Sequence, residues 1–453
     1  MPLIKFFKKI LRPQAPAVEI TVELPTIARN KHCISKTEIS TNALQVINHL
    51  NHHGHQAYLV GGSVRDLLLR KAPKDYDVAT SATPQQIKKL FRNARIIGRR
   101  FKLVHITFQR EIIEVSTFRS NLPDDQLQTN DQGMVIRDNV YGTLEQDAWR
   151  RDFTINSLYY DVRDGSIVDY TNGFPDVHNK CIQMIGDPGV RYQEDPVRML
   201  RAIRFAAKLH FDIDEQTAKP IFKLGQLINQ VSSARLFDEV TKLWQCHESL
   251  KAFRLLTQFN LFEKLFPWTH LSIQQHENAL KMIEIALENT DARMKDQRPT
   301  TPAFLYAVLL WFPMRDLSLK LQAEEEIHPL AALEKAMGKI LIDQTQIISI
   351  PRRFIQLIRE IWLLQYRFAK RVGQKPIQLM NHARFRAAYD FLGIRALAGD
   401  ESLELADWWT QFQDADEATQ LKMIEEVQSV SSSKPKRKRR RKKVKKDPEP
   451  QND

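Results

Sequence analysis

The chain is poor in features that would place it among secreted, membrane or redox proteins. It has only three cysteines in 453 residues, Cys33, Cys181 and Cys246, and their spacing matches neither a metal site nor a disulfide framework. The longest apolar run, residues 303–312, is shorter than the roughly 20 residues that span a bilayer. Glycine is scarce, with 15 residues, as expected for a mainly helical body. We therefore expect a cytoplasmic protein of two to four domains.

A glycine turn is the first informative feature that is present. Residues 57–60 predict a short buried strand, Gly61-Gly62 predicts a turn that tolerates positive φ, and residues 63–70 predict a helix. Such a strand, turn and helix start aims backbone N–H groups and the positive helix end at one point, which suits an anion. The residues expected to bind phosphate groups here are Gly61, Gly62, Ser63 and Arg65.

Two aspartates follow this turn. Residues 76–80 predict a second strand, and a period of two places Asp75 and Asp77 on one face of it. Adjacent carboxylates repel each other, and a divalent cation removes that conflict. Mg²⁺ prefers such oxygen ligands, with Mn²⁺ as an alternative. A Gly-Gly pair alone is usually only a turn, and an Asp-x-Asp motif alone is usually a solvated strand edge. The two motifs together, in this order and spacing, favour a binding site for a nucleoside triphosphate and two metal ions.

Further motifs follow in a fixed order. They are residues 61–66 with 75–77, residues 114–119, residues 150–158 and residues 194–205. In this order they resemble the nucleotidyltransferase superfamily, and within it the class that contains bacterial poly(A) polymerases and tRNA CCA-adding enzymes. The resemblance extends over roughly residues 40–410. Ser63 departs from the pattern, since many relatives carry a third glycine there, but Ser is a good helix-capping residue.

The resemblance implies roles for individual residues. Asp75 and Asp77 would hold the two catalytic Mg²⁺ ions, and either Glu114 or Asp152 would complete the metal site. The catalytic residues that it implies are Asp75, Asp77 and Asp152. In addition to the residues of the glycine turn, the implied nucleotide-binding residues are Arg150, Arg151, Asp195 and Arg198. Arg201 and Arg204 would bind RNA. Asp195 and Arg198 are three residues apart, which predicts one helical face. The alternative for these helical residues is a solvated face with ion pairs.

The fold class expected is α+β. A nucleotidyltransferase head with a small mixed sheet would precede an all-α neck, body and tail, because strand signals end near residue 180. The parts expected are an N-terminal extension (1–39), a catalytic head (40–180), a neck for base selection and RNA binding (181–245), an RNA-binding body and tail (246–425) and a disordered polybasic end (426–453). Residues 354–368 carry apolar side chains at helical spacing, which predicts a packed core stripe.

Both ends of the chain are basic. Residues 1–12 alternate apolar side chains with lysines, which predicts a short amphipathic helix that contacts a membrane surface weakly, or docks on protein or RNA. Residues 434–446 hold eleven Lys and Arg, and without residues 434–453 the net charge falls from +13 to +5. Such a run stays disordered and binds phosphate backbones, or merely aids solubility. The RNA-binding residues expected there are Lys436, Arg437, Lys438, Arg439, Arg440, Arg441, Lys442 and Lys443.

The resemblance leaves a choice between two enzymes. The long N-terminal extension favours a poly(A) polymerase. Residues 233–239 resemble the polymerase form of a neck motif, where CCA-adding enzymes usually carry a Glu-Arg pair. Residues 385–392 and the basic tail also resemble the polymerases. The expected function is template-independent polyadenylation of RNA 3′ ends, including those of mRNA, with AMP transferred from ATP and pyrophosphate released. The alternatives are a tRNA CCA-adding nucleotidyltransferase and a non-catalytic RNA-binding protein with a transferase-like head.

Overall fold

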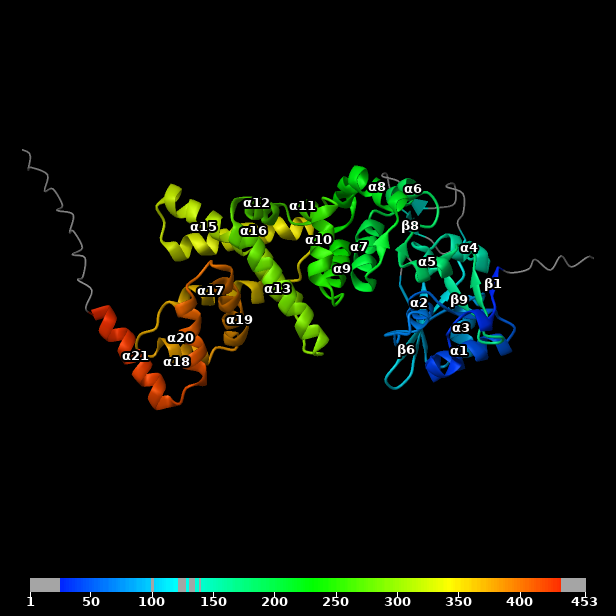
Figure 1. The fold of residues 1–453 in the computed structure, drawn as a ribbon, viewed down its shortest axis with the longest axis horizontal. Helices are drawn as coiled ribbons and strands as arrows, with labels where there is room; N and C mark the ends of the chain where they lie inside the picture. Colours follow the sequence, from blue (N-terminus) through cyan, green and yellow to red (C-terminus); the bar gives the residue numbers. More distant parts are fainter. Residues whose placement is uncertain (1–24, 99–101, 121–127, 130–134, 138–139, 433–453) are drawn as a thin grey trace, which may run out of the picture. The chain divides into compact units, whose positions relative to one another are not determined.

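The structure is a computed structural model that describes residues 25–98, 102–120, 128–129, 135–137 and 140–432. The chain divides into two compact units, and Figure 1 labels their elements. Unit 1 comprises residues 1–179 and 183–186, and unit 2 comprises residues 180–182 and 187–453. The N-terminal amphipathic segment and the polybasic tail, with its eight expected RNA-binding residues, lie outside the described residues. Membrane contact through residues 1–12 therefore stays a prediction.

Unit 1 is built on one mixed sheet of eight strands (Figure 1). In sheet order these are β1 (Thr26–Ile27), β10 (Ile167–Asp169), β9 (Leu158–Tyr160), β2 (Ala57–Val60), β3 (Asp77–Thr80), β6 (Ile112–Thr117), β5 (Leu103–Thr107) and β4 (Ala94–Ile97). The pairing of β3 with β6 is parallel, and the other neighbouring pairs are antiparallel. A separate antiparallel pair consists of β7 (Gln128–Thr129) and β8 (Val135–Arg137). The expected small mixed sheet is confirmed.

Short helices connect these strands. They are α1 (Thr41–His52), α2 (Gly62–Leu68), α3 (Pro84–Leu90), α4 (Leu144–Trp149) and α5 (Gly173–Asn179), with the 3₁₀ turns η1 (Arg29–Lys31), η2 (Lys36–Glu38) and η3 (Thr154–Asn156). Local sequence explains where several of them begin. Thr83 accepts a hydrogen bond from the backbone N–H of Gln86, whose side chain accepts one from the N–H of Thr83. This reciprocal cap satisfies two N–H groups that the helix cannot pair itself.

The sheet includes residues that the sequence assigned to the N-terminal extension. Thr26 pairs with Val168 on β10, and His32 Nε2 lies 2.9 Å from the carbonyl oxygen of Gly165. The sheet of unit 1 therefore includes described residues that precede position 40. A two-residue strand has no alternating pattern of its own, so only its pairing with a strand 140 residues later reveals it.

Unit 2 is mainly helical. Its elements are β11 (Cys181–Ile182), α6 (Pro188–Glu194), α7 (Val197–Leu209), β12 (Asp212–Ile213), α8 (Glu215–Leu224), η4 (Gly225–Gln230), α9 (Ser233–Trp244), α10 (Ser249–Gln258), α11 (Phe262–Leu265), α12 (Pro267–Gln275), α13 (Glu277–Lys295), α14 (Pro302–Leu309), α15 (Trp311–Glu325), α16 (Pro329–Ile347), α17 (Arg352–Phe368), α18 (Lys375–Met380), α19 (Phe385–Ala398), α20 (Leu403–Asp414) and α21 (Glu417–Ser432). The expected all-α character holds except for β11 and β12, which pair in parallel over two residues.

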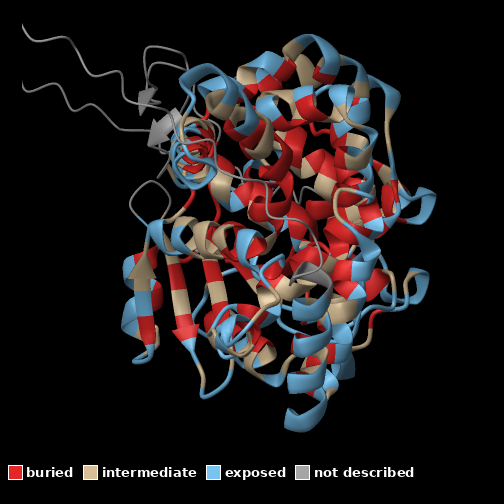
Figure 2. Ribbon diagram, turned by 90° about the vertical axis from the view of Figure 1, so that its left-hand side faces the viewer, coloured by how far each residue is buried: buried red, intermediate tan, exposed pale blue. Residues whose placement is uncertain are grey.

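The core of unit 2 lies between its helices. Trp244, Trp362 and Trp409 are fully buried, and Figure 2 shows buried residues along the inner sides of the helices. The expected apolar stripe of α17 is confirmed, since Ile358 and Ile361 are fully buried. None of the described helices is both long enough and apolar enough to cross a membrane.

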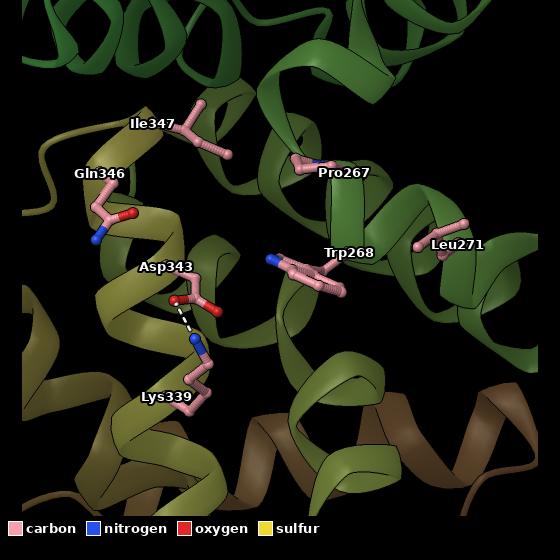
Figure 3. A pocket seen from close by; sticks show the side chains of 7 residues that line it. All are labelled: Pro267, Trp268, Leu271, Lys339, Asp343, Gln346 and Ile347. Atoms are coloured by element: carbon pink, nitrogen blue, oxygen red, sulfur yellow. Dashed lines mark hydrogen bonds and ion pairs between the residues drawn. The ribbon is translucent and has the colours of Figure 1, made fainter.

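A pocket of about 460 Å³ opens between α12 and α16 of unit 2 (Figure 3). Its lining residues are Pro267, Trp268, Leu271, Lys339, Asp343, Gln346 and Ile347. Lys339 Nζ and Asp343 Oδ1 form an ion pair at 3.0 Å across one side of it. None of the residues expected to catalyse, bind metal or bind nucleotide belongs to this pocket.

Gly173 offers a test of how tightly unit 1 is packed beside η3. A Cβ atom at Gly173 would overlap the backbone carbonyl of Thr154, whereas one at Gly338 inside α16 would meet no atom within 4 Å. We expect Gly173→Ala to lower the free energy of unfolding by about 1–3 kcal/mol, because the backbone must move. Gly338→Ala should be neutral or stabilising by about 0.5–1 kcal/mol. Urea unfolding of both variants checks this, and equal effects would contradict it.

Candidate active site

The glycine turn joins β2 to α2. Gly61 has φ 74°, as expected for a turn that needs glycine, and it caps α2, which begins at Gly62. Ser63 does not cap the helix. Its hydroxyl donates to the carbonyl oxygen of Val60 at 3.1 Å, and the residue is 2% exposed. The helix start is therefore formed by glycine backbone alone, and Ser63 ties the turn to the end of β2.

Arg65 connects this turn to the loop of the motif at residues 150–158, whose first three residues, Arg150, Arg151 and Asp152, are called the Arg-Arg-Asp signature below. Its side chain is 3% exposed and donates to Asp66 Oδ1 from Nε at 2.9 Å and from Nη2 at 2.7 Å. Its Nη1 donates to Asn156 Oδ1 at 2.6 Å, and Asn156 Nδ2 donates to Asp152 Oδ1 at 3.1 Å. These contacts give Arg65 a structural role inside unit 1. Its contact with a phosphate group stays a prediction.

The paired carboxylates lie where β3 begins. The strand begins at Asp77, one residue later than expected, so the exposed Asp75 precedes it in a bend. Asp77 is opposite Glu114 in the parallel pairing of β3 with β6. Burial, followed by the negative charges of Glu114 and Asp75, raises the pKa of Asp77 to about 6, although the positive charge of Arg151 opposes this. Three carboxylates and one guanidinium thus share one electrostatic environment.

The two candidates for the third carboxylate have different surroundings. Strand pairing brings Glu114 beside Asp77, as expected for a strand partner, and its carboxylate also lies 3.2 Å from His105 Nε2. Asp152 Oδ1 accepts hydrogen bonds from the backbone N–H of Phe153 at 2.8 Å and from Asn156. One oxygen of Asp152 therefore holds its own loop, and the pairing favours Glu114 as the neighbour of Asp77.

Arg151 is fixed beside the glycine turn. Its Nε donates to the Tyr159 hydroxyl at 2.8 Å, and its Nη2 donates to Asp147 Oδ2 at 3.1 Å. The Tyr159 hydroxyl donates to the same Asp147 oxygen at 2.7 Å, which closes the network. A Cβ atom on Gly61 would lie 3.5 Å from Arg151 Nη1, so this guanidinium approaches the turn closely. Arg150, the other arginine of the signature, is the C-cap residue that follows α4.

Sequence reasoning missed Asp147 and Tyr159. The four-residue spacing between Asp147 and Arg151 was an available signal for their ion pair, because such residues face each other on a helix. No sequence pattern links Tyr159 to either of them. Tyr159 lies on β9, which pairs with β2 in the sheet, and its hydroxyl meets Arg151 there.

The carboxylates fit a metal ion that arrives with its nucleotide. Among the described residues, no three His, Cys, Asp or Glu side chains form a cluster that could hold a metal by themselves. Mg²⁺ is commonly bound by one or two carboxylates, with substrate phosphates and water completing its shell. The raised pKa of Asp77 reflects burial first and then the like charges of Glu114 and Asp75, and a cation would compensate both. The donor set at Asp75, Asp77 and Glu114 is therefore suitable for such a shared site.

In unit 2, the expected base-selecting pair does not share one helical face. Asp195 has φ −151° and ends α6, whereas Arg198 lies in α7, which begins at Val197. The reason is Pro196, because the residue before a proline disfavours helical backbone. Asp195 Oδ2 accepts a hydrogen bond from Arg235 Nη2 at 2.6 Å, a partner in α9 that sequence reasoning did not assign to this pair.

The other arginines of this region are partly buried in unit 2. Arg198 Nη1 donates to Glu194 Oε2 at 2.8 Å, and Arg204 Nε lies 3.9 Å from Glu239 Oε2. The guanidinium carbons of Arg201 and Arg204 lie 5.4 and 4.6 Å from the ring centre of Phe205. Ion pairs are thus present on this helix, as the alternative interpretation expected. RNA binding by Arg201 and Arg204 stays a prediction.

Three family profiles match the chain. A poly(A) polymerase head domain matches residues 57–183, a probable RNA- and SrmB-binding site of polymerase A matches residues 210–271, and an arginine-rich C-terminus of polymerase A matches residues 325–444. The first covers the glycine turn, the carboxylates and the Arg-Arg-Asp signature. The third includes α16 to α21 of unit 2.

Curated proteins resemble this chain over most of their length. Poly(A) polymerase I of Salmonella typhi is 43% identical over 434 residues, covering 93% of each chain. Poly(A) polymerase I of Haemophilus influenzae is 45% identical over 403 residues, covering 87% of this chain and 89% of that protein. The crystal structure of the Bacillus stearothermophilus CCA-adding enzyme in complex with CTP covers 86% of this chain and 82% of that one, with a TM-score of 0.54 and 24% identity. That last likeness shows the fold alone.

The raised pKa of Asp77 predicts a pH-dependent stability in metal-free protein. The folded-state pKa of about 6 lies above the ordinary value of 3.8, so the folded state holds the proton more tightly and stability falls as pH rises through this range. Asp77→Asn should therefore melt a few °C above the wild type at pH 8, with the gap closing towards pH 4. Asp75→Asn, at an exposed position, should show a smaller gap. A gap for Asp77→Asn that does not change with pH would contradict the assignment.

Proposed function

The chain belongs to the poly(A) polymerase family, and we propose that it transfers AMP from ATP to RNA 3′-hydroxyl groups by the residues described above. The reaction is template-independent polyadenylation with release of pyrophosphate, so the protein is a polynucleotide adenylyltransferase. The observation that carries the residue assignment is the convergence of the Gly61 turn, the fixed Arg151 and the partly buried Asp77 in unit 1. One place therefore offers backbone room for phosphates, a held positive charge and carboxylates for metal ions.

Each residue has a distinct task in this proposal. The triphosphate lies against Gly61 and Gly62, where the absence of side chains lets backbone N–H groups approach it. Arg151 neutralises developing charge on the phosphates, and because Asp147 and Tyr159 already hold it, no reorganisation is needed during reaction. Arg150 is a further nucleotide contact.

Asp75 and Asp77, with Glu114 beside them, are the proposed ligands of two Mg²⁺ ions, or Mn²⁺. Such ions, when bound, would stabilise the attacking and leaving oxygens of an in-line displacement. Asp77 is ionised above its pKa of about 6, so its carboxylate is available as a ligand at neutral pH. Asp152 acts through Asn156 and Arg65, which hold the signature loop against the glycine turn.

Base selection is assigned to unit 2. We place it at Asp195 and Arg198, each of which already has a charged partner, Arg235 and Glu194 respectively. Side chains held in this way lose little conformational freedom when a base edge binds. Arg235 is a positioning residue in this scheme, because it acts through the Asp195 carboxylate.

The RNA substrate is proposed from a family profile, and the cell compartment from the state of the cysteines. The family profile over residues 210–271 names a probable RNA-binding site, which supports RNA 3′ ends, including those of mRNA, as substrates. A cytoplasmic location is consistent with three free cysteines, Cys33, Cys181 and Cys246, since a reducing compartment keeps thiols unpaired.

Removal of either aspartate should abolish AMP transfer. Asp75→Asn and Asp77→Asn are incubated with a labelled RNA primer, Mg²⁺ and one nucleoside triphosphate at a time. The wild type should make long tails from ATP alone, while both variants lose about 100-fold or more of the rate, as expected when metal ligands are removed. RNA binding should be nearly unchanged.

The control is Glu145→Gln, which neutralises an exposed carboxylate on α4 and should extend RNA normally. Normal activity in the Asp77 variant would sink the metal assignment. Addition of two C and one A to a truncated tRNA, without long tails, would identify a CCA-adding enzyme. No extension by the wild type would support a non-catalytic RNA-binding protein.

Arg235 provides a separate test of base selection. Arg235→Gln leaves Asp195, 22% exposed, without its charged partner, and a lost charged hydrogen bond costs about 1.5–3 kcal/mol. We expect kcat/KM for ATP to fall about 10- to 100-fold and the preference for ATP over CTP to weaken, with partial recovery in Arg235→Lys. Arg254→Gln removes a more exposed ion pair with Glu284 and should change little. Unchanged nucleotide preference in Arg235→Gln would refute this role.

A further inference from the structure

The outward face of α17 and the turn after it form a surface of one charge sign. Residues 352–375 contain seven Lys and Arg and a single acid, Glu360, whose carboxylate pairs with Arg384 on the next segment at 2.9 Å. The seven cations are Arg352, Arg353, Arg359, Arg367, Lys370, Arg371 and Lys375. Within the described part of the chain, none of these seven has an ion-pair partner. The surface is therefore not the solvated face of alternating charges that surface helices usually carry.

Helical spacing explains why these charges face outward. Ile358, Ile361 and Phe368 are fully buried and fix the inner side of α17. Arg359 and Tyr366 are seven residues apart, which is close to two turns, so both lie away from that inner side. Tyr366 is 39% exposed, although a tyrosine ring on an amphipathic helix gains by packing inward.

Two aromatic rings lie among the cations at the end of α17. Lys370 Nζ is 4.5 Å from the ring centre of Tyr366, and the guanidinium carbon of Arg371 is 5.3 Å from the ring of Trp408 on α20. Trp408 stacks on Phe412 with ring centres 4.7 Å apart and planes 12° from parallel, so its position is set by the core. The α20 acids form no ion pair with these cations among the residues described. Cations thus lie against aromatic rings at two places near the end of α17.

We infer that this surface, residues 352–375 with Trp408, binds single-stranded RNA, with a base stacked on Tyr366 and phosphates beside Arg367, Lys370 and Lys375. Aromatic rings accept any base because every base has a π-face, and unpaired cations follow the backbone. An acidic protein would satisfy the charges but would not require an exposed ring. The inference rests on the proposed function, because it assigns a place to the RNA that is extended.

The test compares full-length variants in binding a fluorescent 20-nucleotide oligo(A) without ATP. Arg367, Lys370 and Lys375 are all exposed, so Arg367→Gln, Lys370→Gln and Lys375→Gln together should leave the melting midpoint unchanged. We expect affinity to fall about 10-fold near 0.1 M salt, and the slope of log affinity against log salt to decrease by about 2, as for three lost single-strand phosphate contacts. The basic end of the chain contributes equally to every variant.

Stacking is tested at Tyr366. Tyr366→Ala should weaken oligo(A) binding about 5-fold or more, whereas Tyr366→Phe, which keeps the ring, should bind as the wild type does. The matched charge control replaces three other exposed lysines, Lys281, Lys320 and Lys335, by Gln and should bind within about 2-fold of wild type. In extension assays the Arg367, Lys370 and Lys375 triple variant should raise KM for RNA and leave kcat unchanged.

The outcomes separate this inference from the proposed function. The inference is overturned if the wild type extends RNA but the triple variant and Tyr366→Ala both bind oligo(A) normally. An acidic protein would then be the better candidate for binding this surface. If the charge control loses as much affinity as the triple variant, the effect is one of net charge and the inference is likewise overturned. Absence of extension by the wild type would instead refute the proposed function, whatever the binding results.

Discussion

The candidate site of unit 1 depends on one electrostatic constraint, the partly buried carboxylate of Asp77 beside the carboxylate of Glu114. Parallel pairing of β3 with β6 imposes this proximity, and the nearby Asp75 adds to it. Arg151 relieves only part of the repulsion, since the pKa of Asp77 remains raised. A protein built only for stability would gain by replacing one of these acids with an apolar residue. The divalent cations of the proposed function would compensate this repulsion.

The residues around this conflict act as supports. Asp147 and Tyr159 hold Arg151, while the chain of contacts from Arg65 through Asn156 holds the loop that contains Asp152. Groups held in this way stabilise developing charge without reorganising, which is the main source of rate enhancement in phosphoryl chemistry. The Arg-Arg-Asp signature therefore serves two purposes, because one of its residues faces the glycine turn and another secures the loop.

The two units divide the chemistry by charge. Unit 1 concentrates carboxylates at the start of β3, which suits metal ions and a triphosphate. Unit 2 places unpaired cations along α17 and partly paired ones on α7, which suits a polyanionic chain. In the proposals above, unit 1 would hold the nucleotide with its metal ions, and the cations of α17 would contact the phosphates of the RNA.

Local sequence determined the glycine turn, the capped start of α3 and the apolar stripe of α17. Each follows from turn chemistry, periodicity or spacing within a few residues. Tertiary structure alone decided that β1 joins the sheet, that Arg65 points inward, that Tyr159 reaches Arg151 and that Arg235 holds Asp195. These contacts join residues up to 142 positions apart, such as Thr26 and Val168, and no local sequence pattern predicts them. The sequence thus specified the chemical groups, and the fold decided which of them meet.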